Sequence, residues 1–171
     1  MMHVTNVRCE YVSNPLGLDT LSPRFSYELQ ATERGQRQTA YQVLVASTRA
    51  NVQADHGDVW DSGPVESAQS TNIEFAGKAL TSGATYFWKA RVWDASGAVS
   101  PYSAAATFEM GLLQPADWQG TWIAREDKAS PLFRKTFDIT QPVTRARLYI
   151  SGLGYYEARL NGAKVGEHVL D

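Results

Sequence analysis

The sequence predicts an all-β protein, and two observations lead to that prediction. The first is a strict alternation over residues 85–94, TYFWKARVWD, which is typical of a long strand with one face in the core. The face expected to be buried carries Tyr86, Trp88, Ala90 and Val92. The second is a series of short strand-like segments separated by turn signals, with no convincing helix between them, which favours a β-sandwich.

Shorter strands are expected on both sides of this segment within the first 110 residues. In chain order they span residues 4–8, 24–29, 40–47, 59–61, 72–75 and 103–110. Turn signals separate them at Asn14-Pro15, Ser22-Pro23, Ser62-Gly63-Pro64, Ser82-Gly83 and Asp94-Ala95-Ser96-Gly97. Glycine and proline favour turn geometries that interrupt a strand, so each segment is expected to be a separate strand.

Tyr86 is expected to fix the corner that precedes the long strand. The stretch LTSGATY places Leu80, Gly83 and Tyr86 where a tyrosine hydroxyl can turn back to the preceding backbone. The alternative is an ordinary buried tyrosine whose hydroxyl reaches solvent. With the turn-rich DASGAVSPYS after the strand, residues 1–110 resemble a fibronectin type III-like domain. That resemblance indicates a fold and is silent on function.

A connector and a second β-rich region follow. Residues 111–120, GLLQPADWQG, are punctuated by glycine and proline, and Trp118 and Trp122 are expected to anchor them by packing. The second region contains strand-like segments at 131–139, 145–152 and 155–162. Asn161-Gly162 is the signal for a type I′ hairpin turn, with residues 163–165 as the return strand.

The Gly152-x-Gly154 pair after an apolar run raises the question of a dinucleotide-binding loop. Such a loop needs a third glycine and a following helix whose N-terminus binds pyrophosphate. Here Glu157 stands in the third position and strand-like sequence follows. We therefore expect the two glycines to supply turn conformations between strands.

The overall composition excludes several classes of function. The chain has 171 residues, 43% hydrophobic and 20% charged, which suits a folded globular protein. A net charge of -2 gives no electrostatic footprint for nucleic acid or an anionic membrane, and no apolar run approaches the length of a membrane span. No signal peptide is visible, which predicts a cytoplasmic location. The single cysteine, Cys9, is expected to be a structural free thiol.

No catalytic or metal-binding residue and no cofactor can be assigned from the sequence. His3, His56 and His168 are scattered without metal-ligand spacing and are expected at the surface. Neither a nucleophile elbow nor a phosphate-binding loop is present. Carboxylates such as Asp58, Asp61, Asp94 and Glu126 fall in turns or at strand ends. A hydrolytic pair would need two acids held across a cleft, and none is indicated.

Several stretches in register resemble the N-terminal region of bacterial α-L-rhamnosidases, which are inverting glycoside hydrolases. They are NPLGLDTLSPRFSYEL, RGQRQTAYQVLVAS, VWDSGPVESAQS, YFWKARVWDASG, FEMGLLQPADWQGTWI, PLFRKTFDI and ARLYISGLGYYEARLNGAKVG. The resemblance covers nearly the whole chain. It implies a fibronectin-like sandwich over residues 1–110, a connector at 111–120 and the first part of a jelly-roll, sugar-binding-like β-domain over 121–171.

The same resemblance implies that the catalytic machinery lies elsewhere. The family has a further β-region, a six-fold α/α barrel that holds the catalytic glutamates, and a C-terminal β-domain, all downstream. SGLGYYEARLNG matches an early hairpin of the second sandwich, whose strands are expected to continue beyond Asp171. No catalytic role is therefore transferred to this chain, and no sugar-contacting residue can be matched position by position.

The leading hypothesis is a non-catalytic N-terminal part of an α-L-rhamnosidase, whose partner is the remainder of the enzyme. One alternative is a free-standing carbohydrate-binding module with a rhamnoside ligand, in which Trp93, Tyr155 and Tyr156 stack on a sugar. For these three aromatics, packing against a neighbouring domain is favoured, because large apolar patches usually mark interfaces. Another alternative is a fibronectin-type protein-interaction module. A homodimer through the incomplete second domain is a further expectation.

Overall fold

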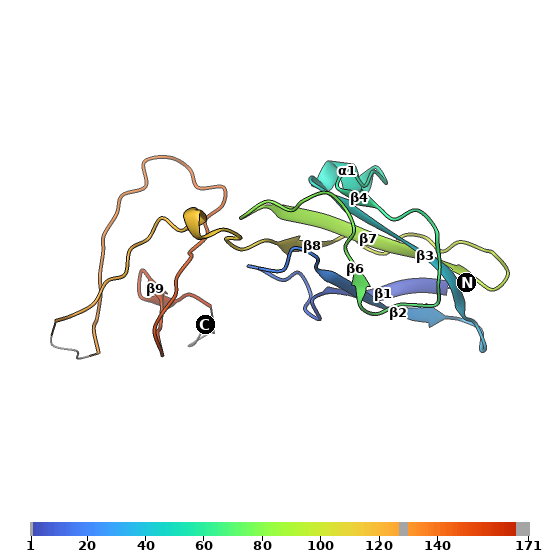
Figure 1. The fold of residues 1–171 in the computed structure, drawn as a ribbon, viewed down its shortest axis with the longest axis horizontal. Coiled ribbons are helices and arrows are strands. Elements are labelled where there is room, and N and C mark those ends of the chain that lie inside the picture. Colours follow the sequence, from blue (N-terminus) through green and yellow to red (C-terminus); the bar gives the residue numbers. More distant parts are fainter. Residues whose placement is uncertain (1, 127–129, 167–171) are drawn as a thin grey trace. The chain divides into compact units, whose positions relative to one another are not determined.

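The protein is described by a computed structural model that covers residues 2–126 and 130–166. The chain divides into two compact units, Met1–Thr121 and Trp122–Asp171, each of which is described by itself (Figure 1). Strands dominate the first unit, as the sequence predicts. Across the described ranges, no helix is long and apolar enough to cross a membrane.

The first unit contains two antiparallel sheets, and their inner faces enclose its core. One sheet has the order β1–β2–β6 and consists of β1 (Met2–Cys9), β2 (Arg24–Ala31) and β6 (Ile73–Glu74). The five-stranded sheet has the order β4–β3–β7–β8, and β5 also pairs with β3. Its members are β3 (Gln38–Ala46), β4 (Trp60–Asp61), β5 (Val65–Glu66), β7 (Thr85–Asp94) and β8 (Ala106–Glu109).

The predicted strands of the first unit are confirmed. The long strand has the expected bounds, 85–94, and each shorter predicted segment contains an observed strand. Two short elements were not predicted: β5, and the single-turn helix α1 (Arg49–Gln53). The expectation of no helix is wrong at α1, whose five residues are too few to show a helical periodicity.

The core is built from the alternating face that the sequence indicates. Trp88, Ala90 and Val92 of β7 are completely buried. The Trp88 ring lies 4.5 Å from the Phe25 ring of β2, centroid to centroid, which joins the two sheets. Cys9 is also completely buried. Its burial, and to a lesser extent the nearby Glu10 charge, raises the pKa of its thiol to about 12. Such a thiol is unreactive, as expected of a structural cysteine.

Tyr86 forms the predicted corner. Its hydroxyl accepts a hydrogen bond of 2.9 Å from the backbone N–H of Thr81, five residues earlier. The ring stacks on Phe108 of β8 at 5.2 Å between centroids, and the residue is 6% exposed. The side chain therefore ties the loop before β7 to the core.

Residues following β8 remain attached to the first unit. The backbone N–H of Leu113 donates to the Ser82 hydroxyl at 3.0 Å, and Ser82 also bonds the carboxylate of Asp117. Asp117 ends the short 3-10 turn Pro115–Asp117. The expected anchoring by tryptophans is wrong, because Trp118 is 46% and Trp122 is 70% exposed. Polar contacts to Ser82 hold the segment instead.

The second unit contains one short hairpin among its described residues. It consists of β9 (Arg159–Leu160) and β10 (Ala163–Lys164) around Asn161-Gly162, whose φ angles are 50° and 84°. Two successive positive φ angles confirm the predicted type I′ turn. The strands predicted at 131–139 and 145–152 are not formed in the described part of the chain. An alternating segment becomes a strand only when a neighbour pairs with its backbone, and here no such ladder is present.

Candidate functional site

The outer face of the five-stranded sheet gathers the charged and aromatic side chains of the first unit. Along β7, Phe87, Lys89, Arg91 and Trp93 alternate with the buried residues and point away from the core. Each of the four takes part in a cation–π contact. The face is covered at one end by α1, crossed in the middle by Tyr102, and open at the end that carries Trp93.

Helix α1 covers the end of this face where β3 and β7 pass beneath it. Its first turn is capped by Thr48, whose hydroxyl accepts from the Asn51 N–H at 3.1 Å, and Val52 is completely buried beneath it. Asp55, just beyond the helix, forms an ion pair with Lys89. The Lys89 side chain is only 8% exposed, so this carboxylate supplies the partner that a buried ammonium requires.

A hydrogen-bonded cluster fixes the middle of the face. The Arg91 Nε donates to Gln42 Oε1 at 2.8 Å, and the Tyr102 hydroxyl donates to the same oxygen at 3.1 Å. The Gln42 amide nitrogen in turn donates to Asp61 Oδ1 at 2.6 Å. The Arg91 guanidinium lies over both aromatic neighbours, 4.6 Å from the Tyr102 centroid and 5.1 Å from that of Trp93. Arg91 is thereby held in one orientation.

A shallow depression of about 380 Å³ lies at the open end of the face. Its central positions are set by strand register, since Ala40 of β3 is opposite both Glu66 of β5 and Trp93 of β7. Directly opposed residues share a face of the sheet, so the small Ala40 forms a floor between the indole and the carboxylate. Thr39, Pro64 and Gly97 complete the lining.

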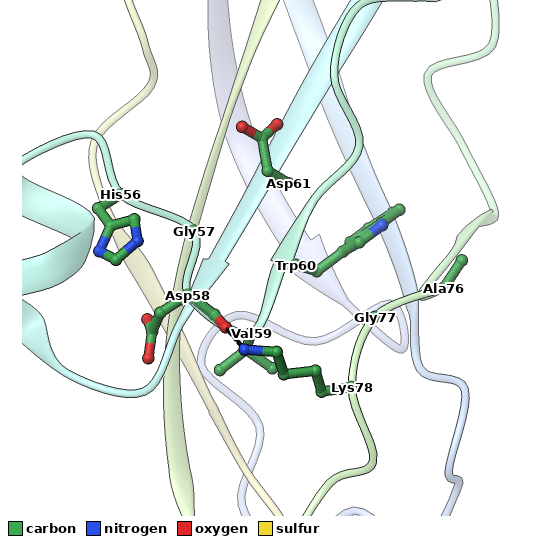
Figure 2. Close-up of a pocket in the computed structure, with 9 residues that line it drawn as sticks. All are labelled: His56, Gly57, Asp58, Val59, Trp60, Asp61, Ala76, Gly77 and Lys78. Carbon is green, nitrogen blue, oxygen red and sulfur yellow. Dashed lines mark hydrogen bonds between the residues drawn. The ribbon is translucent and has the colours of Figure 1, made fainter.

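A second, larger depression lies where residues 56–61 meet residues 76–78 (Figure 2). The two segments touch through backbone: the Lys78 N–H donates to the Val59 carbonyl at 3.0 Å. A Cβ atom on Gly77 would lie 2.5 Å from the Trp60 Cβ, so only glycine allows this approach. Figure 2 shows that the His56 ring, the Trp60 ring and the Asp61 carboxylate diverge rather than converge on one point.

The charged groups of the second depression serve the fold. The Lys78 ammonium donates to the Asp58 carbonyl at 2.6 Å. The Asp58 carboxylate accepts from both the backbone N–H and the hydroxyl of Ser47. Burial alone would raise the pKa of Asp58, but these hydrogen bonds outweigh it and hold the pKa below its ordinary value. Asp58 is thus a structural hydrogen-bond acceptor and not a candidate proton donor.

The histidines do not form a site in the described part of the chain. His3 and His56 are exposed, as predicted, and His168 lies outside the described residues. No group of three or more potential metal ligands occurs within residues 2–126 and 130–166. The carboxylates considered earlier also have local roles: Asp94, for example, accepts from the N–H groups of Ser96 and Ala98 in the turn after β7.

The second unit has an exposed apolar surface of unusual extent. Among the described residues of the first unit, the exposed large hydrophobic side chains are Tyr11, Val12, Leu16, Leu21, Val99 and Trp118. The much shorter second unit exposes Trp122, Ile123, Leu132, Phe133, Phe137, Ile139, Val143, Leu148, Tyr149, Ile150, Leu153, Tyr155, Leu160 and Val165. We call these fourteen side chains the apolar surface of the second unit. Exposed apolar side chains in such number are typical of a surface that another part of a protein covers.

The three aromatic residues considered for sugar stacking belong to different units. Trp93 lies in the first unit beside Arg91, whereas Tyr155 and Tyr156 lie in the second. Tyr155 is 85% exposed, and Tyr156 packs close to Gly152, where an added Cβ would lie 2.9 Å from its ring. Of the three, Trp93 lines a depression that also contains the Glu66 carboxylate.

Several residues of the outer face could not be identified from sequence. Glu66 and Tyr102 lie in short segments without clear alternation, and their positions depend on pairing with β3 and β7. Asp55 is placed by helix α1, which the sequence pattern does not predict. No sequence signal indicates this partner, because the alternation places Lys89 on the face of the strand that is expected to be exposed.

Two family models match the chain. The first, described as the Rha78A-like N-terminal immunoglobulin domain, matches residues 4–114. The second, described as the alpha-L-rhamnosidase N-terminal domain, matches residues 141–171.

Relatives of known sequence or structure agree with these matches. An alpha-L-rhamnosidase of Formosa agariphila is 39% identical over 93% of this chain and 19% of its own length. One from Streptomyces avermitilis is 36% identical over 99% of this chain and 19% of its own length. The solved structure of an alpha-L-rhamnosidase from Dictyoglumus thermophilum superimposes with a TM-score of 0.91 at 39% identity, covering 98% of this chain and 21% of that one. The chain therefore spans about a fifth of the length of these relatives.

Proposed function

Because the chain belongs to the family of Rha78A-like N-terminal immunoglobulin domains, we propose that it is a non-catalytic supporting part of an enzyme that hydrolyses terminal α-L-rhamnosides. The matching region amounts to about a fifth of the relatives named alpha-L-rhamnosidase. Its role would be to brace the catalytic part, which lies in the rest of such an enzyme. The bracing function rests on one observation, the apolar surface of the second unit.

The apolar surface fits a role in docking because its sequence retains strand-like alternation. Ala146, Leu148 and Ile150 occupy every second position, and Leu148 and Ile150 are 57% and 42% exposed. Fully burying a side chain of this size contributes about 1.5 to 3 kcal/mol. Residues 131–152 also form no β-ladder among the described residues. A neighbouring strand could therefore bury these side chains and pair with the backbone at the same time.

We propose that further strands of the same enzyme cover this surface and complete a jelly-roll sandwich. Such a fold needs about eight strands to close two inner faces, and the described second unit has only β9 and β10. A homodimer in which a second copy covers the surface is the competing arrangement. Molecular mass in solution separates the two, because only the competing arrangement doubles the mass of this chain.

The proposed function is tested by assaying an aryl α-L-rhamnoside with two proteins. The 171-residue chain alone is expected to give no turnover, because both carboxylates of the larger depression, Asp58 and Asp61, are engaged in hydrogen bonds that hold the fold. A longer protein that continues into a helical barrel is expected to hydrolyse the substrate. Replacing Leu148 and Ile150 together by serine in the longer protein should lower its stability or activity.

The matched control is Leu16→Ser, which removes a leucine of the first unit that is 66% exposed. Turnover by the purified short chain that disappears when one of its own carboxylates is replaced would refute the non-catalytic assignment. A longer protein that tolerates serine at both positions without change would refute the docking role.

A further inference from the structure

We propose that the depression between Trp93 and Glu66 is a binding site for a neutral pyranoside, independent of the bracing role. The ligand would lay its apolar face on the Trp93 indole and donate hydroxyl hydrogen bonds to the Glu66 carboxylate. The floor would be Ala40, whose methyl group leaves room between them.

Strand geometry gives the site a suitable width. Glu66, Ala40 and Trp93 occupy three adjacent strands at one register position, so the outer two side chains start about 10 Å apart, twice the usual strand spacing. A single sugar ring standing between them can contact the indole on one side and the carboxylate on the other. The depression, at about 380 Å³, lies at the small end of the range of about 300 to 1,000 Å³ that is usual for ligand sites.

Charge selects the class of ligand. The Arg91 guanidinium lies 5.1 Å from the Trp93 ring centroid. A cationic ligand bound to the same indole would therefore be repelled by a like charge. Glu66 places a carboxylate on the opposite wall, which disfavours an anion. A ligand that satisfies both walls is uncharged, has one apolar face, and carries hydroxyl donors on its edge. A pyranoside has these three properties.

The two side chains are available and their supports are fixed. In the described part of the chain, neither the Glu66 carboxylate nor the Trp93 indole N–H takes part in a hydrogen bond or ion pair. Arg91, which lies against the indole, is held by Gln42, and Thr39 bonds the carbonyl oxygens of Trp93 and Asp94. The indole is thereby oriented before any ligand arrives, which reduces the ordering cost of binding.

The test is a titration of the 171-residue chain with methyl α-L-rhamnopyranoside and methyl α-D-glucopyranoside. The indole N–H resonance of Trp93, assigned with Trp93→Phe, is followed by NMR. At least one pyranoside is expected to shift this resonance saturably, with a Kd on the order of 1 to 10 mM for so open a site. Tetramethylammonium, a cation that favours aromatic faces, is expected to leave it unmoved.

Variants are compared through saturation transfer to the sugar protons, which needs no tryptophan reporter. Trp93→Ala should abolish the signal, and Glu66→Gln should weaken binding about tenfold through the loss of charge-assisted hydrogen bonds. Ala40→Val, which fills the floor and leaves both walls in place, should also abolish it. Trp118→Ala removes an exposed indole outside the depression and should change nothing.

Two results would overturn the site. One is the absence of any saturable shift at Trp93 with either sugar up to about 100 mM. The other is binding that survives both Trp93→Ala and Ala40→Val while the β7 amide resonances show an intact sheet. Neither result bears on hydrolysis by a longer protein, so this inference and the proposed function can fail separately.

Discussion

At the scale of the single residue, Glu10 and Arg24 form an ion pair that several hydrogen bonds reinforce. Arg24 donates to Glu10 through its backbone N–H at 2.6 Å and through Nε and Nη2 at 3.1 and 2.7 Å. The Glu10 N–H donates back to the Arg24 carbonyl at 2.9 Å. Glu10 and Tyr11 both have positive φ angles, 47° and 65°. The pair therefore holds the chain in the left-handed conformation directly after β1. Residues with a side chain adopt that conformation only at a cost in free energy.

This ion pair makes stability depend on pH. The side-chain hydrogen bond from Arg24 is the main cause that lowers the pKa of Glu10 below 4.5, against the opposing effect of burial. A lowered folded-state pKa means that the stabilisation is complete above 4.5 and is lost as the pH falls through the folded-state value. We expect Glu10→Gln to lower the denaturation midpoint at pH 7, and the difference from the unaltered chain to shrink as the pH drops below 4.5.

Urea titrations of both proteins across that pH range provide the measurement. Glu28→Gln is a matched control, because it neutralises an exposed glutamate on β2, the strand that also carries Arg24. A Glu10→Gln deficit that stays constant down to the lowest pH would contradict the ionic origin of the effect.

Tyr86 gives a second prediction at the residue scale. Tyr86→Phe keeps the ring on Phe108 and removes the hydroxyl that accepts from the Thr81 N–H. We expect the free energy of unfolding to fall by about 1 kcal/mol, because a partly buried N–H then lacks its acceptor. Chemical denaturation measures the change. Tyr11→Phe, at an exposed tyrosine bonded to Asn72, is the control, and equal effects of the two substitutions would argue against the corner.

At the scale of the element, sequence patterns succeeded where the partner strand lies within the same unit. Residues 85–94 alternate, and β3 and β8 pair with them, so prediction and structure coincide. Residues 145–152 alternate as clearly, yet form no ladder among the described residues. Alternation records which face is to be buried and contains no information on whether a neighbour is present.

The candidate site illustrates the same limit. Trp93 could be selected from sequence because it is an aromatic residue on the outer face of an obvious strand. Glu66 could not, because β5 has only two residues and its register with Ala40 is a tertiary property. Helix α1, with a threonine N-cap but a single turn, was missed for lack of length.

A prediction at this scale concerns the segment that crosses the end of β4. Gly77 lies against Trp60, and an added Cβ would lie 2.5 Å from the Trp60 Cβ and 2.6 Å from the Val59 carbonyl oxygen. Because the Val59 contact is backbone, it cannot turn away. We expect Gly77→Ala to lower the free energy of unfolding by about 1 to 3 kcal/mol, the usual cost of overpacking.

Gly120→Ala is the matched control for Gly77. An added Cβ there meets nothing within 4 Å, and its φ angle is not positive. Thermal unfolding followed by circular dichroism compares the two variants. Equal midpoints would show that residues 76–78 can move away from β4, contrary to the close packing described.

At the scale of the whole molecule, the two units differ in how completely they bury their apolar residues. The first unit encloses a continuous core of both sheets, including Trp88, Phe25 and Phe108. The second exposes fourteen large hydrophobic side chains among its described residues. Exposed alternating segments that are not paired into a sheet favour association with another chain. The first unit is therefore expected to fold without the second. The stability of the second unit is expected to depend on a partner that covers its apolar surface.

This difference predicts unequal hydrogen exchange in the 171-residue chain. Amides of β3 and β7 should be protected to the level of global unfolding, because they lie in the centre of a buried sheet. Amides of residues 131–152 should exchange rapidly in dilute monomer, since no ladder protects them in the described structure. Their protection should rise if light scattering shows association, or in a longer protein whose additional strands pair with them. A strict monomer in which residues 118–166 are protected, with no contact to residues 1–110, would show a self-sufficient second domain. It would also remove the basis for the proposal that further strands of a longer protein cover this unit.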